Sequence, residues 1–218
     1  MMLRSRSVRL AALGLGTLVM TACGGGSSSP PAPTTVTTST VDATGDATAA
    51  GGGTAWDITQ VTTSRLISGA TSLSISVTFA QAISAANLPA PGASMATPAQ
   101  LGAALIFATG GAGTSASGLN GCVGNPTFPN ATFLLDPGAI ASPRLADGNF
   151  AILNTTAAII SGEASISFTG PNTLTYTIPL SAIGGGSGAV QLAAVALNGS
   201  GGSSSTTDCA PNASYIST

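Results

Sequence analysis

The residues that could carry chemistry in this chain are its acidic side chains and its cysteines, because the 218 residues include no histidine and no lysine. Without histidine, Ser-His-Asp and Cys-His catalysis, haem ligation through histidine and the usual zinc and copper sites are excluded. Without lysine, Schiff-base chemistry and a Ser-Lys dyad are excluded. The chemistry that remains is that of carboxylates and thiols.

Three aspartates, Asp42, Asp46 and Asp57, lie around the start of the first predicted strand. Hard cations take carboxylate and carbonyl oxygens as ligands, so these residues are candidate ligands for calcium. The alternative interpretation is that they are solvated aspartates of turns. No other cofactor is predicted.

A carboxylate-dependent glycosidase needs two carboxyl groups about 5 to 10 Å apart across a cleft. The candidates are Asp57, Asp136, Asp147 and Glu163, and their spacing singles out no pair. Asp136 and Asp147 each begin a turn sequence, Asp-Pro-Gly and Asp-Gly-Asn, which favours a structural role. We therefore predict no catalytic residues and expect that the chain is not an enzyme.

Cys23 ends an N-terminal segment typical of an export signal. Three arginines precede an uncharged run at residues 10–20, which is too short to cross a bilayer that needs roughly 20 apolar residues. Residues 20–23, Met-Thr-Ala-Cys, resemble a bacterial lipobox, with Met20 where leucine is usual.

This resemblance implies that the signal peptide, residues 1–22, is removed and that Cys23 carries acyl chains such as palmitate. Several chains would attach the protein to a membrane almost permanently. Gly24 follows the cysteine, where many inner-membrane lipoproteins carry aspartate, which implies the outer membrane, facing the periplasm or the cell surface. An ordinary secretory signal cut after Ala22 is the alternative.

Once Cys23 carries lipid, Cys122 and Cys209 remain as one pair. An oxidising cell envelope permits a disulfide between them. It would close a loop of about 87 residues, for which the chain-entropy model gives roughly 4 to 5 kcal/mol. Two buried reduced thiols are the alternative.

The composition restricts the partners. After removal of the signal, two arginines face seven acidic residues, a net charge of about −5. Such a chain cannot neutralise a row of phosphates, so nucleic acid is excluded as a partner. Only 6% of the residues are charged, against roughly 25% in ordinary soluble domains, so solubility must depend on hydroxyl and amide groups.

The chain divides into a tether and one domain. Residues 23–53 are rich in Gly, Ser, Pro and Thr, which predicts a flexible, disordered tether after the lipidated cysteine. Residues 41–46 are an exception within it, since they form a possible first turn of the domain. The domain itself is predicted to span residues 54–218.

Alternation with a period of two predicts strands throughout this domain. Residues 56–67 and 72–79 form one predicted hairpin, and residues 164–168 and 174–178 form another. The further predicted strands are residues 103–108, 132–135, 150–153, 157–160 and 190–197. Helix signals are confined to residues 98–105 and 180–183, whereas residues 109–130 and the segment after Gly199 are predicted to be polar loop and tail.

Many short strands with Gly, Pro and Asn turns predict an all-β fold, a single antiparallel, jelly-roll-like β-sandwich. Trp56 and Tyr176 are predicted to pack in its core rather than to stack on a sugar. Arg65 and Arg144 are expected to be surface ion-pair partners.

The order of four motifs resembles exported DOMON-like sandwiches related to family 9 carbohydrate-binding modules. The motifs are Asp-x-x-Gly-Asp at residues 42–46, Trp-Asp-Ile-Thr at residues 56–59, Leu-Ser-Ile-Ser-Val-Thr-Phe at residues 73–79, and Leu-Thr-Tyr-Thr-Ile-Pro-Leu-Ser at residues 174–181. Those modules often hold calcium in a central acidic segment, whereas residues 105–114 here contain no carboxylate.

These observations favour a non-catalytic, membrane-anchored envelope lipoprotein that is structural or binds a glycan or a protein. A carboxylate-dependent polysaccharide hydrolase is the alternative.

Overall fold

The structure is a computed structural model. It describes residues 32–49, 53–67, 69–93, 97, 99–109, 114–116, 128–135, 144–154, 159–184, 189–200, 203–212 and 215–218. The fold below is that of the compact unit Pro33–Thr218. Within the described ranges, no helix has the length and apolar character needed to span a bilayer.

Strands dominate these ranges. They are β1 (Thr35–Val41), β2 (Ile58–Leu66), β3 (Ser72–Phe79), β4 (Leu101–Ala108), β5 (Thr114–Ala116), β6 (Phe128–Ala131), β7 (Phe133–Leu135), β8 (Phe150–Asn154), β9 (Ile159–Thr169), β10 (Thr173–Pro179), β11 (Gln191–Ser200), β12 (Ser203–Ala210) and β13 (Ile216–Ser217). Two short 3₁₀ helices, η1 (Ala85–Asn87) and η2 (Leu180–Ile183), follow β3 and β10.

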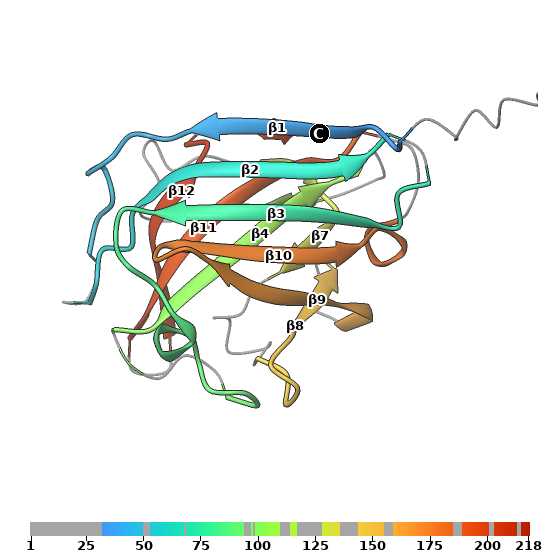
Figure 1. Cartoon of the computed structure of the whole chain (residues 1–218). Coiled ribbons are helices and arrows are strands. Elements are labelled where there is room, and N and C mark those ends of the chain that lie inside the picture. The colour runs from blue at the N-terminus through green and yellow to red at the C-terminus, as the bar shows by residue number, and fades with distance from the viewer. Residues whose placement is uncertain are drawn as a thin grey trace, which may run out of the picture. The chain divides into compact units, whose positions relative to one another are not determined.

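The strands form two antiparallel layers that pack face to face (Figure 1). The hydrogen-bonded order is β1-β2-β3-β10-β9-β8-β7-β4-β11-β12, with β13 beside β11 and a separate β5-β6 pair. The first layer contains β1, β2, β3, β10 and β9, and the second contains β8, β7, β4, β11 and β12. The predicted all-β antiparallel sandwich is confirmed.

The core lies between the two layers and follows the alternation seen in the sequence. In β3 and β10, every second side chain is buried, because successive residues of a strand point to opposite faces. Trp56 and Tyr176 are buried, as predicted. Their polar atoms bond to backbone carbonyls, Trp56 Nε1 to Gln100 at 3.2 Å and Tyr176 OH to Ala103 at 2.6 Å.

The outer face of the first layer consists of rows of serine and threonine, which we call the hydroxyl face. The pairing register aligns two complete rows across five strands: Ser39, Thr62, Ser76, Thr175 and Ser167; and Thr37, Ser64, Ser74, Thr177 and Ser165. Neighbouring hydroxyls in a row bond to each other, for example those of Ser76 and Thr175 at 2.8 Å. This neutral face fits the expectation that hydroxyl groups replace charge at the surface.

The structure corrects the predicted start of the domain. Residues 23–53 were expected to be a tether, but Thr35–Val41 form β1, which pairs with β2 over its whole length. The prediction relied on the scarcity of large apolar residues. An edge strand can instead be held by backbone hydrogen bonds and by β-branched residues that favour extended backbone.

Three other predictions are also corrected. Leu101–Ala108 is strand β4, which confirms the strand predicted at residues 103–108 and not the helix signal at residues 98–105. The residues after Gly199 include strand β12. The expected loop at residues 109–130 contains β5 and most of β6. Strand β4 is buried on both faces, because its outer side packs in a second apolar cluster with β11 and Cys209. A strand covered on both sides shows no alternation, which explains why a helix signal at residues 98–105 competed with the strand predicted at residues 103–108.

Strand β9 is the corner that joins the two layers. Its first part pairs with β8 and its second part with β10. At Gly162 the backbone has φ +152°, and a Cβ placed there would lie 2.3 Å from the Cβ of Ala182 in η2. Glycine is required at this position both by the backbone conformation and by the closeness of η2.

Replacing this glycine tests the corner. We expect Gly162→Ala to lower the free energy of unfolding by about 2 to 5 kcal/mol, from overpacking and from strained backbone. Urea denaturation of the variant measures the loss. Ser165→Ala, on the exposed side of the same strand, is the control and should change stability by less than about 0.5 kcal/mol. Gly162→Ala combined with Ala182→Gly should recover part of the loss, and no recovery would contradict the steric explanation.

Candidate metal centre

The segment that follows β1 crosses from the first layer to the second at one edge of the sandwich. The amide of Asp42 still donates to the carbonyl of Thr59 in β2, at 2.9 Å. Six residues later, the amide of Thr48 donates to the carbonyl of Thr207 in β12, at 2.8 Å. The start and the end of the described domain are therefore held together along this crossing.

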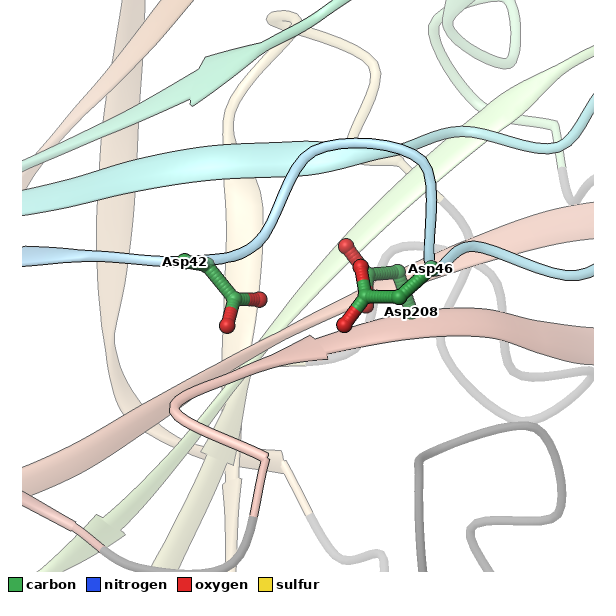
Figure 2. A group of neighbouring side chains, drawn as sticks. All are labelled: Asp42, Asp46 and Asp208. Carbon is green, nitrogen blue, oxygen red and sulfur yellow. The ribbon is translucent and has the colours of Figure 1, made fainter.

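Four aspartates, which we call the aspartate cluster, lie at this crossing: Asp42, Asp46, Asp57 and Asp208. Carboxylate oxygens of Asp42, Asp46 and Asp208 lie within 4.8 Å of one another. Figure 2 shows the first two on the segment after β1 and the third on β12, with the three carboxylates grouped between these elements.

A tight turn and the buried carboxylate of Asp57 shape the segment that carries Asp42 and Asp46. Gly45 adopts φ +90°, a left-handed conformation that glycine accepts without strain. The Gly45 amide donates to Asp57 Oδ2 at 2.8 Å, and Asp57 is only 4% exposed. Asp57 thus holds the turn that brings the other two aspartates together.

The C-terminal part of the chain supplies Asp208 and Asn212. Asp208 is 1% exposed and accepts hydrogen bonds from the amides of Ile58, at 2.6 Å, and Cys209, at 2.7 Å. The side-chain amide of Asn212 donates to Asp42 Oδ1 at 3.2 Å and to Asp46 Oδ2 at 3.1 Å. These bonds orient the carboxylates of both chain segments toward one space.

Several oxygens in this space are buried without a donor among the described residues. They are Asp42 Oδ2, Asp46 Oδ1, Asp57 Oδ1 and Asn212 Oδ1. A buried acceptor that lacks a partner costs roughly 1 to 3 kcal/mol, and more when it is charged. Together with the converging carboxylates of Asp42, Asp46 and Asp208, these oxygens make a site that suits a positively charged group.

The same unfavourable environment raises the pKa of two carboxyl groups. Burial raises the pKa of Asp208 to about 7; bonds from the Ile58 and Cys209 amides lower it, and the charges of Asp42 and Asp46 raise it further. Burial also raises the pKa of Asp42 to about 6, opposed by a backbone bond from Ala43 and reinforced by Asp46 and Asp57. A bound cation would favour the charged form of both groups.

The donor atoms suit a hard divalent cation. All are carboxylate or amide oxygens, and no thiolate or imidazole is present in the cluster, which disfavours zinc and copper. Calcium binds oxygens at about 2.3 to 2.6 Å, so two of its ligands can lie up to about 5 Å apart. A separation within 4.8 Å is compatible with one calcium ion shared by Asp42, Asp46 and Asp208.

The sequence identified part of this centre. Asp42, Asp46 and Asp57 were predicted as candidate calcium ligands. The carboxylates of Asp42 and Asp46 lie close together, and Asp57 accepts a hydrogen bond from Gly45 in the turn between them. Asp208 and Asn212 were missed because they lie more than 160 residues from Asp42, in a segment expected to be a polar tail. The one signal was that Asp208 is the only acidic residue after Glu163.

Of the three cysteines and Asp136, the structure describes only Cys209. Cys23, Cys122 and Asp136 lie outside the described residues. Cys209 is fully buried in β12, within the second apolar cluster. The predicted disulfide between Cys122 and Cys209 therefore stays a prediction.

Two exposed carboxylates of the hydrolase hypothesis, Asp147 and Glu163, do lie close together. The side-chain amide of Asn149 donates to Asp147 Oδ2 at 2.9 Å and to Glu163 Oε2 at 3.2 Å. The two oxygens are therefore at most 6.1 Å apart, the sum of these bond lengths. Glu163 also lines an open groove with polar neighbours from β9 itself and from several other elements: Thr71, Ser72, Asn149, Ser165, Thr177 and Ser181.

The two arginines of the domain lie in different places. Arg144 donates to the carbonyls of Gly148 at 2.9 Å and Pro89 at 3.0 Å, and its guanidinium lies 5.9 Å from the ring centroid of Phe150. Arg65 donates to a main-chain oxygen of Thr218 at 3.0 Å.

Comparison with known proteins gives no further constraint, since no protein family model, curated protein or solved structure shows significant similarity to this chain.

Proposed function

We propose that this chain is a non-catalytic envelope lipoprotein whose β-sandwich binds one calcium ion, and that the ion fastens the segment after β1 to strand β12. The observation that carries the calcium proposal is the group of buried, donorless oxygens around the converging carboxylates of Asp42, Asp46 and Asp208. A cation there would satisfy these oxygens and remove the repulsion between the carboxylates.

The ion would act as a clamp between the two ends of the domain. Asp42 and Asp46 follow β1 directly, whereas Asp208 and Asn212 belong to the last part of the chain. The tether would enter the domain at β1. A pull on a lipid anchor would therefore reach the clamp after only one strand, and the ion would resist separation of β1 from the sandwich.

The envelope location is supported by the N-terminal sequence. Residues 1–22 carry the features of an export signal, and residues 20–23 resemble a lipobox that would place acyl chains on Cys23. We propose the outer membrane as the site, facing the periplasm or the cell surface. The domain would be structural or would bind a glycan or a protein there, as the resemblance to DOMON-like sandwiches suggests.

A polysaccharide hydrolase remains the second candidate, and one observation favours it. Asp147 and Glu163 are at most 6.1 Å apart beside a groove, which is within the separation that glycosidases use. Both carboxylates are exposed and share one amide donor, Asn149. Asp147 also accepts from the Asn149 backbone, at 3.0 Å, which gives it a turn-forming role that needs no catalysis.

The first prediction from this proposed function concerns calcium. For the chain without residues 1–22 and with Cys23→Ser, calcium at 100 times its dissociation constant should stabilise the fold by about 2.7 kcal/mol. That corresponds to a rise in Tm of about 5 to 10 °C over the value in chelator, measured by calorimetry. Magnesium should give a smaller rise, because it prefers to keep its waters.

Matched variants assign this effect to the cluster. Asp46→Asn and Asp208→Asn should each reduce the calcium-dependent rise to below about 2 °C, because each removes a charged ligand. In chelator, Asp46→Asn should not destabilise the protein, since it relieves repulsion between like charges. Asp147→Asn, in an exposed turn, should keep the full calcium response. A wild-type Tm that is the same in calcium and chelator would overturn the proposal.

The second prediction concerns the cysteines. Mass spectrometry of the protein from bacterial membranes should show an N-terminus at Cys23 with acyl chains attached, and Cys23→Ser should release the protein from membranes. Alkylation of the unfolded protein in denaturant, before reduction, should leave Cys122 and Cys209 unmodified, as expected for a disulfide and not for two buried thiols. An unmodified N-terminal residue on a protein that needs no detergent would contradict the lipoprotein assignment.

The third prediction separates the two candidate functions. We expect the purified chain to release no reducing sugars from bacterial cell-wall or extracellular polysaccharides. Should release occur, Asp147→Asn and Glu163→Gln would each have to abolish it for the carboxylate pair to be responsible. Asp46→Asn serves as the control, because it lies in the aspartate cluster and does not line the groove.

A further inference from the structure

Strand β1 has one edge that is not paired within the described part of the chain. It follows β2 in register from Thr35 opposite Leu66 to Val41 opposite Gln60. In an antiparallel pair, the backbone groups of alternate residues point to the partner strand and those of the others point away. Two backbone hydrogen bonds at the ends of β1 show which residues point toward β2 and which point toward the open edge.

The amide of Ile67 donates to the carbonyl of Thr34, and the amide of Asp42 donates to the carbonyl of Thr59. Residues 34 and 42 are both even-numbered, so the even-numbered residues of β1 bond to β2. The odd-numbered residues therefore direct their backbone N–H and C=O groups to the open edge. These residues are Thr35, Thr37, Ser39 and Val41, and all four are exposed.

This edge lacks the features that usually prevent edge-to-edge pairing. Strand β1 contains no charged residue, no proline and no glycine, and its register with β2 has no bulge. The large apolar side chains that are exposed in the described residues, Val36, Val41 and Ile67, all lie on β1 or just after β2. The opposite end of the strand order is different, because Thr48 in the crossing segment bonds to β12.

The sequence of β1 also matches itself when reversed. About a twofold axis at Thr38, Thr37 faces Ser39, Val36 faces Thr40, and Thr35 faces Val41. Each of these pairs joins two hydroxyl residues or the nearly isosteric threonine and valine. A neutral strand of this kind meets its own copy without charge repulsion and without a mismatch in side-chain size.

We propose that β1 is a dimerisation edge that pairs antiparallel with β1 of a second copy of this chain, centred on Thr38. The odd-numbered residues then form the hydrogen-bonded pairs, Thr37 with Ser39 of the second copy and Thr35 with Val41. The even-numbered residues form the non-hydrogen-bonded pairs, Thr38 with Thr38 and Val36 with Thr40.

Such pairing would make one continuous sheet from the two first layers. The hydroxyl rows that end at Thr37 and Ser39 would continue into the rows of the second copy, because those two residues face each other across the edge. The dimer would thus present a neutral hydroxyl face of ten strands. A partner that binds the hydroxyl face would therefore find about twice the binding area on the dimer that it finds on one copy.

Cysteine cross-linking of the full-length chain tests the pairing and its register. Non-hydrogen-bonded residues opposite each other have Cα atoms about 4.5 Å apart, which suits a disulfide. Thr38→Cys should therefore form a covalent dimer on mild oxidation, seen on a non-reducing gel. Thr40→Cys alone should not, whereas a mixture of Val36→Cys and Thr40→Cys chains should.

Charge placed on the edge tests whether pairing depends on it. Thr37→Lys combined with Ser39→Lys would set like charges opposite each other and should weaken the dimer at least about tenfold, measured by light scattering during size-exclusion chromatography. Ser165→Lys with Ser167→Lys is the control, since it adds the same charge to the same face on β9. It should leave the dimer unchanged.

Three results would overturn the proposal. The first is a monomer at all concentrations with no Thr38→Cys cross-link. The second is a cross-link between two Thr40→Cys chains, which requires another register. The third is capture by Thr38→Cys of a different protein in place of a second copy, which would make β1 an edge for a foreign strand.

Discussion

Four carboxylates in one largely buried space set the main constraint on this fold. Asp57 and Asp208 are almost fully buried, and burial together with neighbouring charge raises the pKa of Asp42 and Asp208. Backbone amides and Asn212 satisfy some of the oxygens, while others have no donor among the described residues. The arrangement is costly without a countercharge, and a calcium ion would turn that cost into a link between the two ends of the domain.

The position of this link matters because the sandwich closes there. The segment after β1 leaves β2 at Asp42 and reaches β12 at Thr48, so it covers the side where the two layers meet. Closure at this side protects β12, whereas the outer edge of β1 is not paired with any strand that the structure describes. The proposed clamp and this edge of β1 both follow from one chain path, in which β1 pairs with β2 and the chain then crosses to the opposite layer.

The scarcity of charge shapes the remaining surface. The first layer is covered by aligned serine and threonine hydroxyls, and the arginines that the structure describes bond to carbonyl groups. A protein without histidine or lysine has few routes to catalysis, and its exposed carboxylate pair, Asp147 and Glu163, shares a single amide. These features are the basis on which we propose a structural or binding module with a neutral surface.

Local pattern was enough to predict much of the fold. Strand β3 and the hairpin of β9 and β10 follow directly from alternation, because each has one buried face and one hydroxyl face. Strands without that contrast were less visible in the sequence. Strand β4, which is buried on both sides, was predicted only over residues 103–108, and β1 and β12, which have few large apolar side chains, were missed.

The candidate metal centre likewise has one part that the sequence predicted and another that it did not. The spacing of Asp42, Gly45 and Asp46 is a local property, so the sequence by itself indicated a turn with two possible ligands. Only the tertiary structure decided that Asp57 holds the turn and that Asp208 and Asn212 complete the group. The reason is physical: a residue more than 160 positions away has no periodicity or spacing that ties it to the turn. The two meet because β12 ends the sheet order beside the crossing segment.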